Sequence, residues 1–255
     1  MSDVTETKSE TLIIPTFREA TFGESLDYLL AHLQGPVEIL VVDDSDEDGF
    51  AKLEADVRER LPRLARGITI AVHRGPRLGK GAAIRMGALA PSGDFVYLMD
   101  ADVPVLPEFI DVFRQKLAEG ADIVIGVRDP HRYAGAPLRR VLALGLRALQ
   151  TLVVFQHATF SDTQCGFKAF DGKVLRSLAR LQFTKGGMYD LEYLYAATKR
   201  QLRIEQVPVV LRGEVRASRI NLLRCVLIDP FEIFWFKGCG LFGYYGRDHA
   251  GPSTR

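Results

Sequence analysis

Two aspartates, Asp100 and Asp102, follow a short apolar run that begins at Val96 and is typical of a β-strand. In an extended backbone, residues two apart point to the same side, so both carboxylates can converge on one divalent cation. Mg²⁺ is commonly held by one or two carboxylates together with substrate phosphates, and such a metal stabilises a diphosphate leaving group. The alternative is a turn after the strand, in which the aspartates cap the next helix.

The bulk composition predicts one domain with a sizeable core, because 47% of the 255 residues are hydrophobic and 25% are charged. The formal net charge of +1 argues against a nucleic-acid partner. The three cysteines form no Cys-x-x-Cys pair, so neither a zinc site nor a disulfide framework is indicated, and a cytoplasmic location is expected. Residues 1–10 are polar and are expected to form a flexible tail.

The first half of the chain alternates short apolar runs with helical patterns. Such alternation, with continuously apolar strands, is typical of an α/β fold with a mainly parallel central sheet and helices on both faces. The predicted strands are Thr11–Pro15, Val37–Val42, Ile68–Val72, Phe95–Met99 and Ile123–Val127. The predicted helices between them are Gly23–Leu33, Phe50–Leu64, Gly79–Ala90 and Pro107–Ala118.

Charged residues collect where these predicted strands end. Glu19 follows the first strand, Asp44 the second and Arg128 the fifth, in addition to the two aspartates after the fourth. In open parallel sheets, ligands bind outside the carboxyl ends of the strands. The pattern therefore predicts a nucleotide-type site at this edge.

After Arg128 the alternation changes, and the last part of the chain is rich in aromatic residues. Residues 223–255 contain the only tryptophan of the sequence, Trp235. Nowhere in the sequence does an apolar stretch reach the roughly 18 residues of a membrane-spanning helix. This aromatic segment is expected either to lie on a membrane surface or to pack against the sheet domain or a partner subunit. The elements predicted before it are a helix at Leu138–Phe155, a loop at Phe160–Phe170, a helix at Leu191–Lys199 and a strand at Ile204–Val210.

Six short motifs lie in order along the chain: Ile14-Pro15-Thr16-Phe17-Arg18-Glu19, Val41-Val42-Asp43-Asp44, Gly79-Lys80-Gly81-Ala82-Ala83, Asp100-Ala101-Asp102, Gly126-Val127-Arg128 and Asp162-Thr163-Gln164-Cys165-Gly166-Phe167-Lys168. Together they resemble the inverting family 2 glycosyltransferases of the GT-A fold. Within that family, the sixth motif and the downstream string Asp190-Leu191-Glu192-Tyr193-Leu194-Tyr195 resemble those of polyprenyl-phosphate sugar synthases. Among these synthases, the two strings are most similar to those of dolichyl-phosphate β-glucosyltransferases.

The resemblance implies a site for a nucleotide-diphosphate sugar. Asp100 and Asp102 would flank Mg²⁺ or Mn²⁺, and Lys80 would lie at the uridine or diphosphate region. The chain has Phe-Arg-Glu where the family usually has Tyr-Asn-Glu, and Asp43-Asp44-Ser45-Asp46 where the family has Asp-Asp-Gly-Ser. The remaining residues implied in donor binding are Pro15, Phe17, Glu19, Asp44 and Ala101.

The resemblance also implies residues on the acceptor side. Asp162 is the candidate general base and Asp190 is its rival, although a phosphate acceptor, already ionised at neutral pH, needs a base less. In that case Asp162 would mainly position the acceptor. Guanidinium groups match phosphate oxygens bidentately, and the candidate acceptor-phosphate residues are Arg128, Arg139, Arg140, Arg212 and Arg219.

The implied protein is a metal-dependent inverting hexosyltransferase that moves glucose or mannose from a nucleotide-diphosphate sugar to a polyprenyl phosphate. Residues 11–222 would form a single GT-A domain, with peripheral contact at the cytoplasmic face of a membrane. A glycosyltransferase acting on a small soluble metabolite remains an alternative, as does a nucleotide-binding module without catalysis. A nucleotidyltransferase is disfavoured, because the loop after the first strand, Pro15 to Glu19, has no glycine.

Overall fold

The computed structural model describes residues 8–129, 154–155, 160–212 and 222–246, and the side chains of 222–227 and 229 are not described. Within these residues, a single seven-stranded sheet has the order β3-β2-β1-β4-β6-β5-β7. All neighbouring strands are parallel except β6, which runs antiparallel to both β4 and β5. The strands are β1 (Glu10–Thr16), β2 (Val37–Asp43), β3 (Ile68–Arg74), β4 (Phe95–Leu98), β5 (Ile123–Arg128), β6 (Lys168–Asp171) and β7 (Ile204–Val209).

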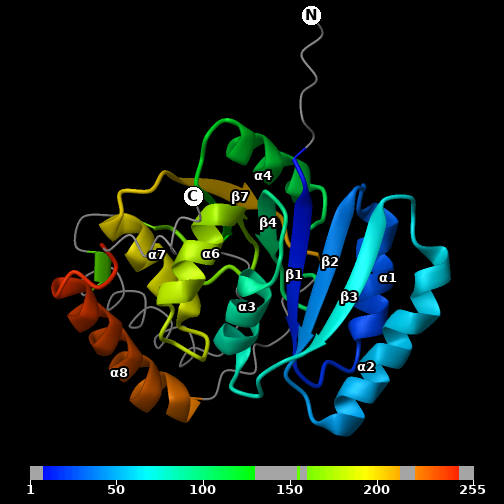
Figure 1. Ribbon diagram of the computed structural model, residues 1–255, viewed down its shortest axis with the longest axis horizontal. Helices are drawn as coiled ribbons and strands as arrows, with labels where there is room; N and C mark the ends of the chain where they lie inside the picture. Colours follow the sequence, from blue (N-terminus) through cyan, green and yellow to red (C-terminus); the bar gives the residue numbers. More distant parts are fainter. Residues whose placement is uncertain (1–7, 130–153, 156–159, 213–221, 247–255) are drawn as a thin grey trace, which may run out of the picture.

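Helices cover both faces of the sheet, because successive strand residues point in opposite directions. In β1, Leu12 and Ile14 pack with α1, α2 and α4, whereas Ile13 packs on the other face with α3, α6, α7 and α8. Figure 1 shows α3 and α6 in front of the sheet. The helices are α1 (Phe22–His32), α2 (Glu47–Arg60), α3 (Lys80–Leu89), α4 (Phe109–Ala118), α6 (Gly172–Leu181), α7 (Tyr189–Lys199) and α8 (Leu222–Leu241), with a 3₁₀ turn at Leu61–Arg63.

The predicted fold class is confirmed, since the sheet is mainly parallel and covered on both faces. Some elements differ from the prediction: α6 and α8 have no counterpart among the predicted helices, and one predicted loop contains a strand. The stretch Phe160–Phe170 was expected to be a loop, but its end forms β6, whose Lys168 and Phe170 pair with both β4 and β5. The strand depends on these two neighbours, which a short run of mixed polarity does not reveal. The predicted helix Leu138–Phe155 lies outside the described residues except for its last two.

Candidate active site

The carboxyl ends of the parallel strands meet at one edge of the sheet, which we call the carboxyl edge. Because β6 is antiparallel, its first residue, Lys168, also lies at this edge, paired with Leu98 at the end of β4. The motif that leads into β6, from Asp162 to Lys168, therefore lies at the same edge of the sheet as Asp100. The structure thus brings the candidate residues before β6 and after β4 together.

Asp44, after β2, anchors the loop that follows β3. Its two carboxylate oxygens accept hydrogen bonds from the backbone N–H groups of Arg77 and Gly79, each at 2.6 Å. Gly75 permits this approach, since a Cβ there would lie 2.5 Å from Asp44 Oδ1. The observed role of Asp44 is to shape the loop that leads to Lys80.

The neighbouring carboxylate of Asp43 is buried, and only one of its oxygens is used within the described structure. Oδ1 accepts hydrogen bonds from the hydroxyls of Thr16 and Ser45, each at 2.8 Å, while Oδ2 has no protein partner. An unsatisfied buried acceptor is costly. This oxygen is therefore a ready acceptor for a donor group of a ligand at the carboxyl edge.

The residues expected around the base and ribose lie after β1. Pro15 is buried within the strand, whereas the Phe17 ring is 58% exposed and available for stacking. Arg18 adopts a left-handed conformation (φ 48°), and its guanidinium pairs with Asp46 at 2.5 Å. Glu19 is half-buried and accepts a hydrogen bond from the Thr21 hydroxyl at 3.0 Å.

Lys80 and Asp100 form an ion pair at the centre of the carboxyl edge, with Nζ to Oδ1 at 2.5 Å. Burial opposes the charged forms of both groups, but their mutual attraction outweighs it. The pKa of Asp100 is therefore lowered and that of Lys80 raised, the latter also by the Asp190 carboxylate. Asp100 is thus held as an anion beside a cation.

Asp102 lies close to Asp100 because of a turn, and not because the two residues share one face of an extended strand, as was expected. β4 ends at Leu98, and Asp100 begins a turn in which its carbonyl accepts from the N–H of Val103. Burial raises the pKa of Asp102, and repulsion from Asp100 raises it further, with a smaller effect from Glu19. Ala101, between the two aspartates, is half-buried.

These two carboxylates fit a divalent metal, because a cation beside them would relieve their repulsion and because hard cations prefer oxygen ligands. No group of three or more His, Cys, Asp and Glu side chains suited to a metal is found among the described residues. Asp100 and Asp102 would therefore hold the metal together with oxygens from the donor phosphates.

Gly166 makes room for the Asp100 carboxylate. A Cβ placed on this glycine would collide with Cγ and both carboxylate oxygens of Asp100. No role for Gly166 was predicted, although it lies within the motif that runs from Asp162 to Lys168. A glycine inside a motif rich in functional groups is the only sequence signal of such a contact.

Asp162 forms a bidentate ion pair with Arg128. The Arg128 Nε and Nη2 groups lie 2.6 and 3.0 Å from the two carboxylate oxygens, and the Arg128 N–H also donates to Oδ2 at 3.2 Å. Burial favours the neutral acid, but these hydrogen bonds outweigh it and lower the pKa of Asp162. The pair joins the candidate base to the end of β5.

Asp190 is paired with Lys168 in the protein interior. The Lys168 Nζ lies 2.7 Å from Asp190 Oδ1 and 2.5 Å from the carbonyl oxygen of Cys165, and both charged side chains are almost fully buried. Removal of one partner from such a pair typically costs about 3–5 kcal/mol. Lys168 was not predicted as a site residue. A lysine next to apolar residues of a strand is a sequence signal for a buried charge, and a buried lysine needs a charged partner.

Of the five candidate acceptor arginines, the structure describes Arg128 and Arg212. Arg212 follows β7, its N–H donates to the Pro104 carbonyl at 2.7 Å, and its guanidinium lies 4.2 Å from the ring centroid of Tyr28. The other three, Arg139, Arg140 and Arg219, lie outside the described residues.

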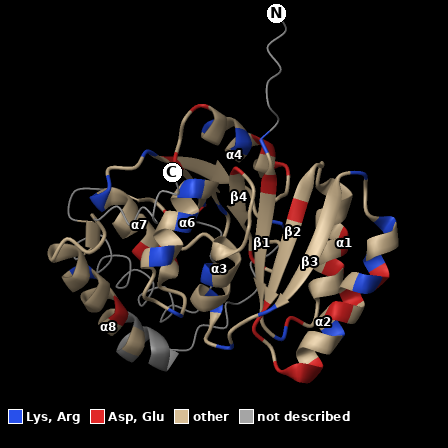
Figure 2. Ribbon diagram, in the orientation of Figure 1, with Lys and Arg blue, Asp and Glu red and all other residues tan. Residues whose placement is uncertain are grey.

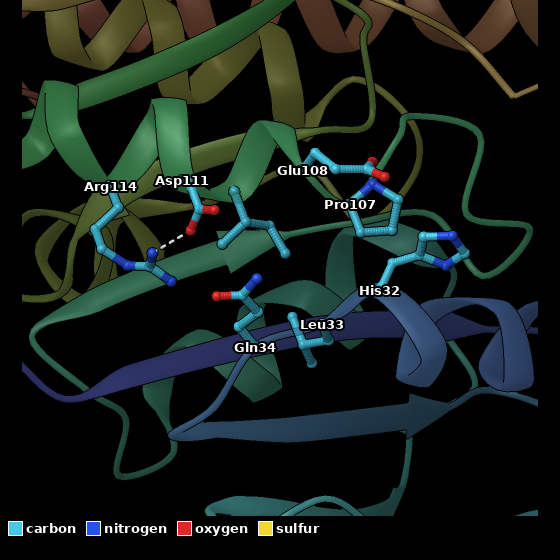
Figure 3. Close-up of a pocket in the computed structure, with 8 residues that line it drawn as sticks. His32, Leu33, Gln34, Pro107, Glu108, Asp111 and Arg114 are labelled. Atoms are coloured by element: carbon cyan, nitrogen blue, oxygen red, sulfur yellow. Dashed lines mark hydrogen bonds and ion pairs between the residues drawn. The ribbon is translucent and has the colours of Figure 1, made fainter.

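A small cavity of about 40 Å³ lies away from this site (Figure 3). It is lined by His32 at the end of α1, by the following Leu33 and Gln34, and by α4, where Arg114 bonds to Asp111. Since Gln34 leads into the start of β2, the cavity lies towards the amino ends of the parallel strands. It has room for a few water molecules and none for a nucleotide.

A mostly parallel sheet that gathers carboxylates, lysines and arginines at its carboxyl edge is typical of α/β proteins that bind a nucleotide or another charged ligand there. The model of the family described as glycosyl transferase family 2 matches residues 11–177. The chain belongs to that family, which confirms the predicted family and the prediction that the protein is a glycosyltransferase enzyme.

Two curated relatives illustrate the similarity in sequence. Dolichyl-phosphate beta-glucosyltransferase ALG5C from Trichomonas vaginalis is 27% identical over 252 residues, which cover 91% of this chain and 72% of the relative. The dolichyl-phosphate beta-glucosyltransferase of Saccharomyces cerevisiae is 24% identical over 230 residues, covering 83% and 69% respectively.

Solved structures share the fold. Glucosyl-3-phosphoglycerate synthase from Mycobacterium tuberculosis, in complex with Mn²⁺, UDP and phosphoglyceric acid, has a TM-score of 0.64 at 20% identity, covering 96% of this chain and 81% of that one. Mannosyltransferase PcManGT from Pyrobaculum calidifontis, in complex with GDP-Man and Mn²⁺, has a TM-score of 0.56 at 22% identity, covering 84% and 59%. These neighbours confirm the GT-A architecture, and their Mn²⁺ supports a divalent metal in the fold.

Proposed function

We propose that this protein transfers a hexose from a nucleotide-diphosphate sugar to a polyprenyl phosphate of the dolichyl type, with inversion at the anomeric carbon. The observation that carries the proposal is that three ion pairs lie together at the carboxyl edge. These pairs are Lys80–Asp100, Arg128–Asp162 and Lys168–Asp190. The names of the curated relatives favour glucose over mannose as the sugar.

On the donor side, Asp44 holds the loop that carries Lys80, and the exposed ring of Phe17 offers a stacking surface for the base. The free oxygen of Asp43 is suited to accept a hydrogen bond from the nucleoside. Lys80 would exchange part of its contact with Asp100 for the anionic diphosphate. Asp100 and Asp102 would hold Mg²⁺ or Mn²⁺, which supplies charge neutralisation of the leaving diphosphate when bound.

On the acceptor side, Arg128 is the described guanidinium nearest to the candidate base. In the proposed reaction, an oxygen of the acceptor phosphate forms a bond to the anomeric carbon, while the bond from that carbon to the diphosphate oxygen breaks. The nucleoside diphosphate leaves with the electron pair, and no proton must be removed from an ionised phosphate. Asp162 would therefore orient Arg128 and the acceptor more than it would act as a base.

A lipid acceptor places the reaction near a bilayer, and α8 offers a surface for such contact. Its described side chains Phe231, Phe234 and Trp235 are 63%, 58% and 47% exposed, while Ile233 and Phe236 are fully buried against the sheet domain. Figure 2 shows little charge on the described part of α8, in contrast to α2. No helix in the described part of the chain is long and apolar enough to cross a membrane.

The decisive experiment incubates the protein with Mg²⁺ or Mn²⁺ and a panel of UDP- and GDP-hexoses, with and without polyprenyl phosphate, and identifies the products. The expected product is a β-linked polyprenyl-phosphate hexose. Transfer to a soluble metabolite with no transfer to lipid phosphate would favour the alternative acceptor. Binding of nucleotide-sugar without any turnover, under all conditions, would contradict the proposal.

A further inference from the structure

Glu192, on α7, is a buried carboxylate with four uncharged donors and no place in the proposed chemistry. It is 1% exposed, and Oε1 accepts from the Phe183 N–H at 2.8 Å and from the Tyr245 hydroxyl at 2.7 Å. Oε2 accepts from the N–H and the hydroxyl of Thr184, at 2.8 and 2.6 Å. Full satisfaction of this kind fixes the chain segment that supplies the donors.

That segment, residues 182–187 between α6 and α7, is called the backing loop below. Its Lys185 carbonyl accepts from the N–H of Ala82 at 3.1 Å, and the amide of Gln182 donates to the carbonyl of Gly81 at 2.8 Å. The contact is close, because a Cβ on Gly81 would lie 2.6 Å from the Gly186 carbonyl oxygen. The backing loop therefore lies directly against the turn at residues 79–82.

This turn begins α3, and it carries Lys80. Gly79 adopts φ +110° and gives α3 no side-chain cap, so the Lys185 carbonyl satisfies one of the N–H groups that a helix start leaves open. Lys80, the first residue of the helix, reaches across to Asp100. The position of its ammonium group thus depends on contacts with the backing loop.

We propose that Glu192 is a positioning residue for Lys80: it holds the backing loop against the turn at 79–82 and so fixes the ammonium group at the donor site. The inference rests on the proposed function only in assigning the donor diphosphate to Lys80. The same arrangement couples α8 and the residues after it to the site. Trp235 on α8 stacks on Phe183, with ring centroids 5.4 Å apart, and Tyr245, beyond the end of α8, bonds to Glu192.

The first test is structural and needs no activity. Glu192→Gln replaces one accepting oxygen by an NH₂ group that faces N–H or O–H donors, so the backing loop should loosen. Hydrogen exchange of peptides covering residues 79–89 should become at least several-fold faster than in the unchanged protein. Leu117→Ala on α4, which packs on the other face of the sheet, is the control for a general loss of stability; it should leave exchange at 79–89 unaltered.

The second test separates positioning from independent effects. Glu192→Gln should lower kcat/KM for the nucleotide-sugar by about tenfold, whereas the double variant with Lys80→Ala should be no slower than Lys80→Ala alone. Multiplication of the two losses would overturn the proposal, as would unaltered exchange at 79–89 in folded Glu192→Gln. Inactivity of the unchanged protein towards every donor would count against the proposed function, and the exchange experiment would still decide the role of Glu192.

If Glu192→Gln does not fold, Gly81→Ala tests the same contact from its other side. The added methyl group would press on the Gly186 carbonyl while the carboxylate and its donors stay intact. Faster exchange at the start of α3 is expected, together with a higher KM for the nucleotide-sugar. Normal exchange and normal kinetics in this variant would overturn the proposal.

Discussion

Three aspartates of the candidate site, Asp100, Asp162 and Asp190, each contact a cation from another element of the fold. Asp100 contacts Lys80, Asp162 contacts Arg128, and the third pair joins β6 to α7. A charged ligand that binds here would replace one partner of such a pair, and the side chain that it meets is already oriented. The residue-scale predictions therefore concern how these pairs are held in place.

Gly166→Ala should abolish most activity without unfolding the protein. The new methyl group would occupy the space of the Asp100 carboxylate and force it away from Lys80 and Asp102. We expect at least a hundredfold loss of transfer, measured as product formed per minute, with a circular dichroism spectrum like that of the unchanged protein. Gly238→Ala on α8 is the matched control, because a Cβ there meets nothing within 4 Å. Similar activity in the two variants would contradict the assignment of Asp100.

Asp162→Asn should reduce sugar transfer strongly but leave nucleotide affinity nearly unaltered, because Asp162 is paired with Arg128 at the end of β5 and not with Lys80. Calorimetric titration with nucleoside diphosphate and a transfer assay check the two halves separately. Loss of nucleotide binding in a folded variant would move Asp162 to the donor side.

The same variant has a defined pH dependence of stability. The pKa of Asp162 is lower in the folded protein than its ordinary value of about 4, so its charged form stabilises the fold above that pH. This stabilisation is lost as the pH falls through the folded-state pKa. Asp162→Asn should therefore lower Tm by several degrees at pH 7, and the difference should shrink towards pH 3. Asp27→Asn, which removes an exposed pair with Arg60, should have a smaller effect.

At the scale of elements, the first five strands could be predicted because each is a short, mostly apolar run between helical patterns. β6 could not, because its four residues begin and end with charges, Lys168 and Asp171, and only its neighbours in the sheet define it. The residues of the site were accessible as motifs. Their pairing was not, since Lys80–Asp100 and Arg128–Asp162 join residues 20 and 34 positions apart, and nothing local encodes which cation meets which carboxylate.

The aromatic face of α8 leads to a prediction at this scale. Trp235 is the only tryptophan of the chain, so its fluorescence reports on this helix alone. Vesicles containing anionic phospholipid should shift the emission to shorter wavelength and should sediment with the protein, as interfacial aromatic helices do. Serine at Phe231 and Phe234 should weaken sedimentation at least tenfold. The matched control places serine at the exposed Leu61 and Val112, away from α8, and should leave it unaltered. Emission that ignores vesicles would remove the membrane surface from the proposal.

At the scale of the whole molecule, the fold should not depend on a metal, because the two core clusters are packed on both faces of the sheet and Asp100 is already paired with Lys80. Excess EDTA should therefore abolish transfer while leaving Tm within about one degree. Asp100→Asn or Asp102→Asn should have the same effect on activity. Full activity in EDTA, or in both variants, would contradict the metal site, and a large fall in Tm on chelation would make the metal a structural one.

The antiparallel direction of β6 has a consequence for how such proteins diversify. The chain leaves the sheet at Arg128, the end of β5, and returns at Lys168, the start of β6, and these two strands are direct neighbours. The insertion between them is thus tethered at both ends beside the reacting groups, and its length is not constrained by the sheet. Within this stretch, residues 160–167 must be kept, because they carry Asp162 and Gly166 and place Cys165 and Phe167 in the hydrophobic core. The number of residues before them can change during evolution without altering the order of the strands.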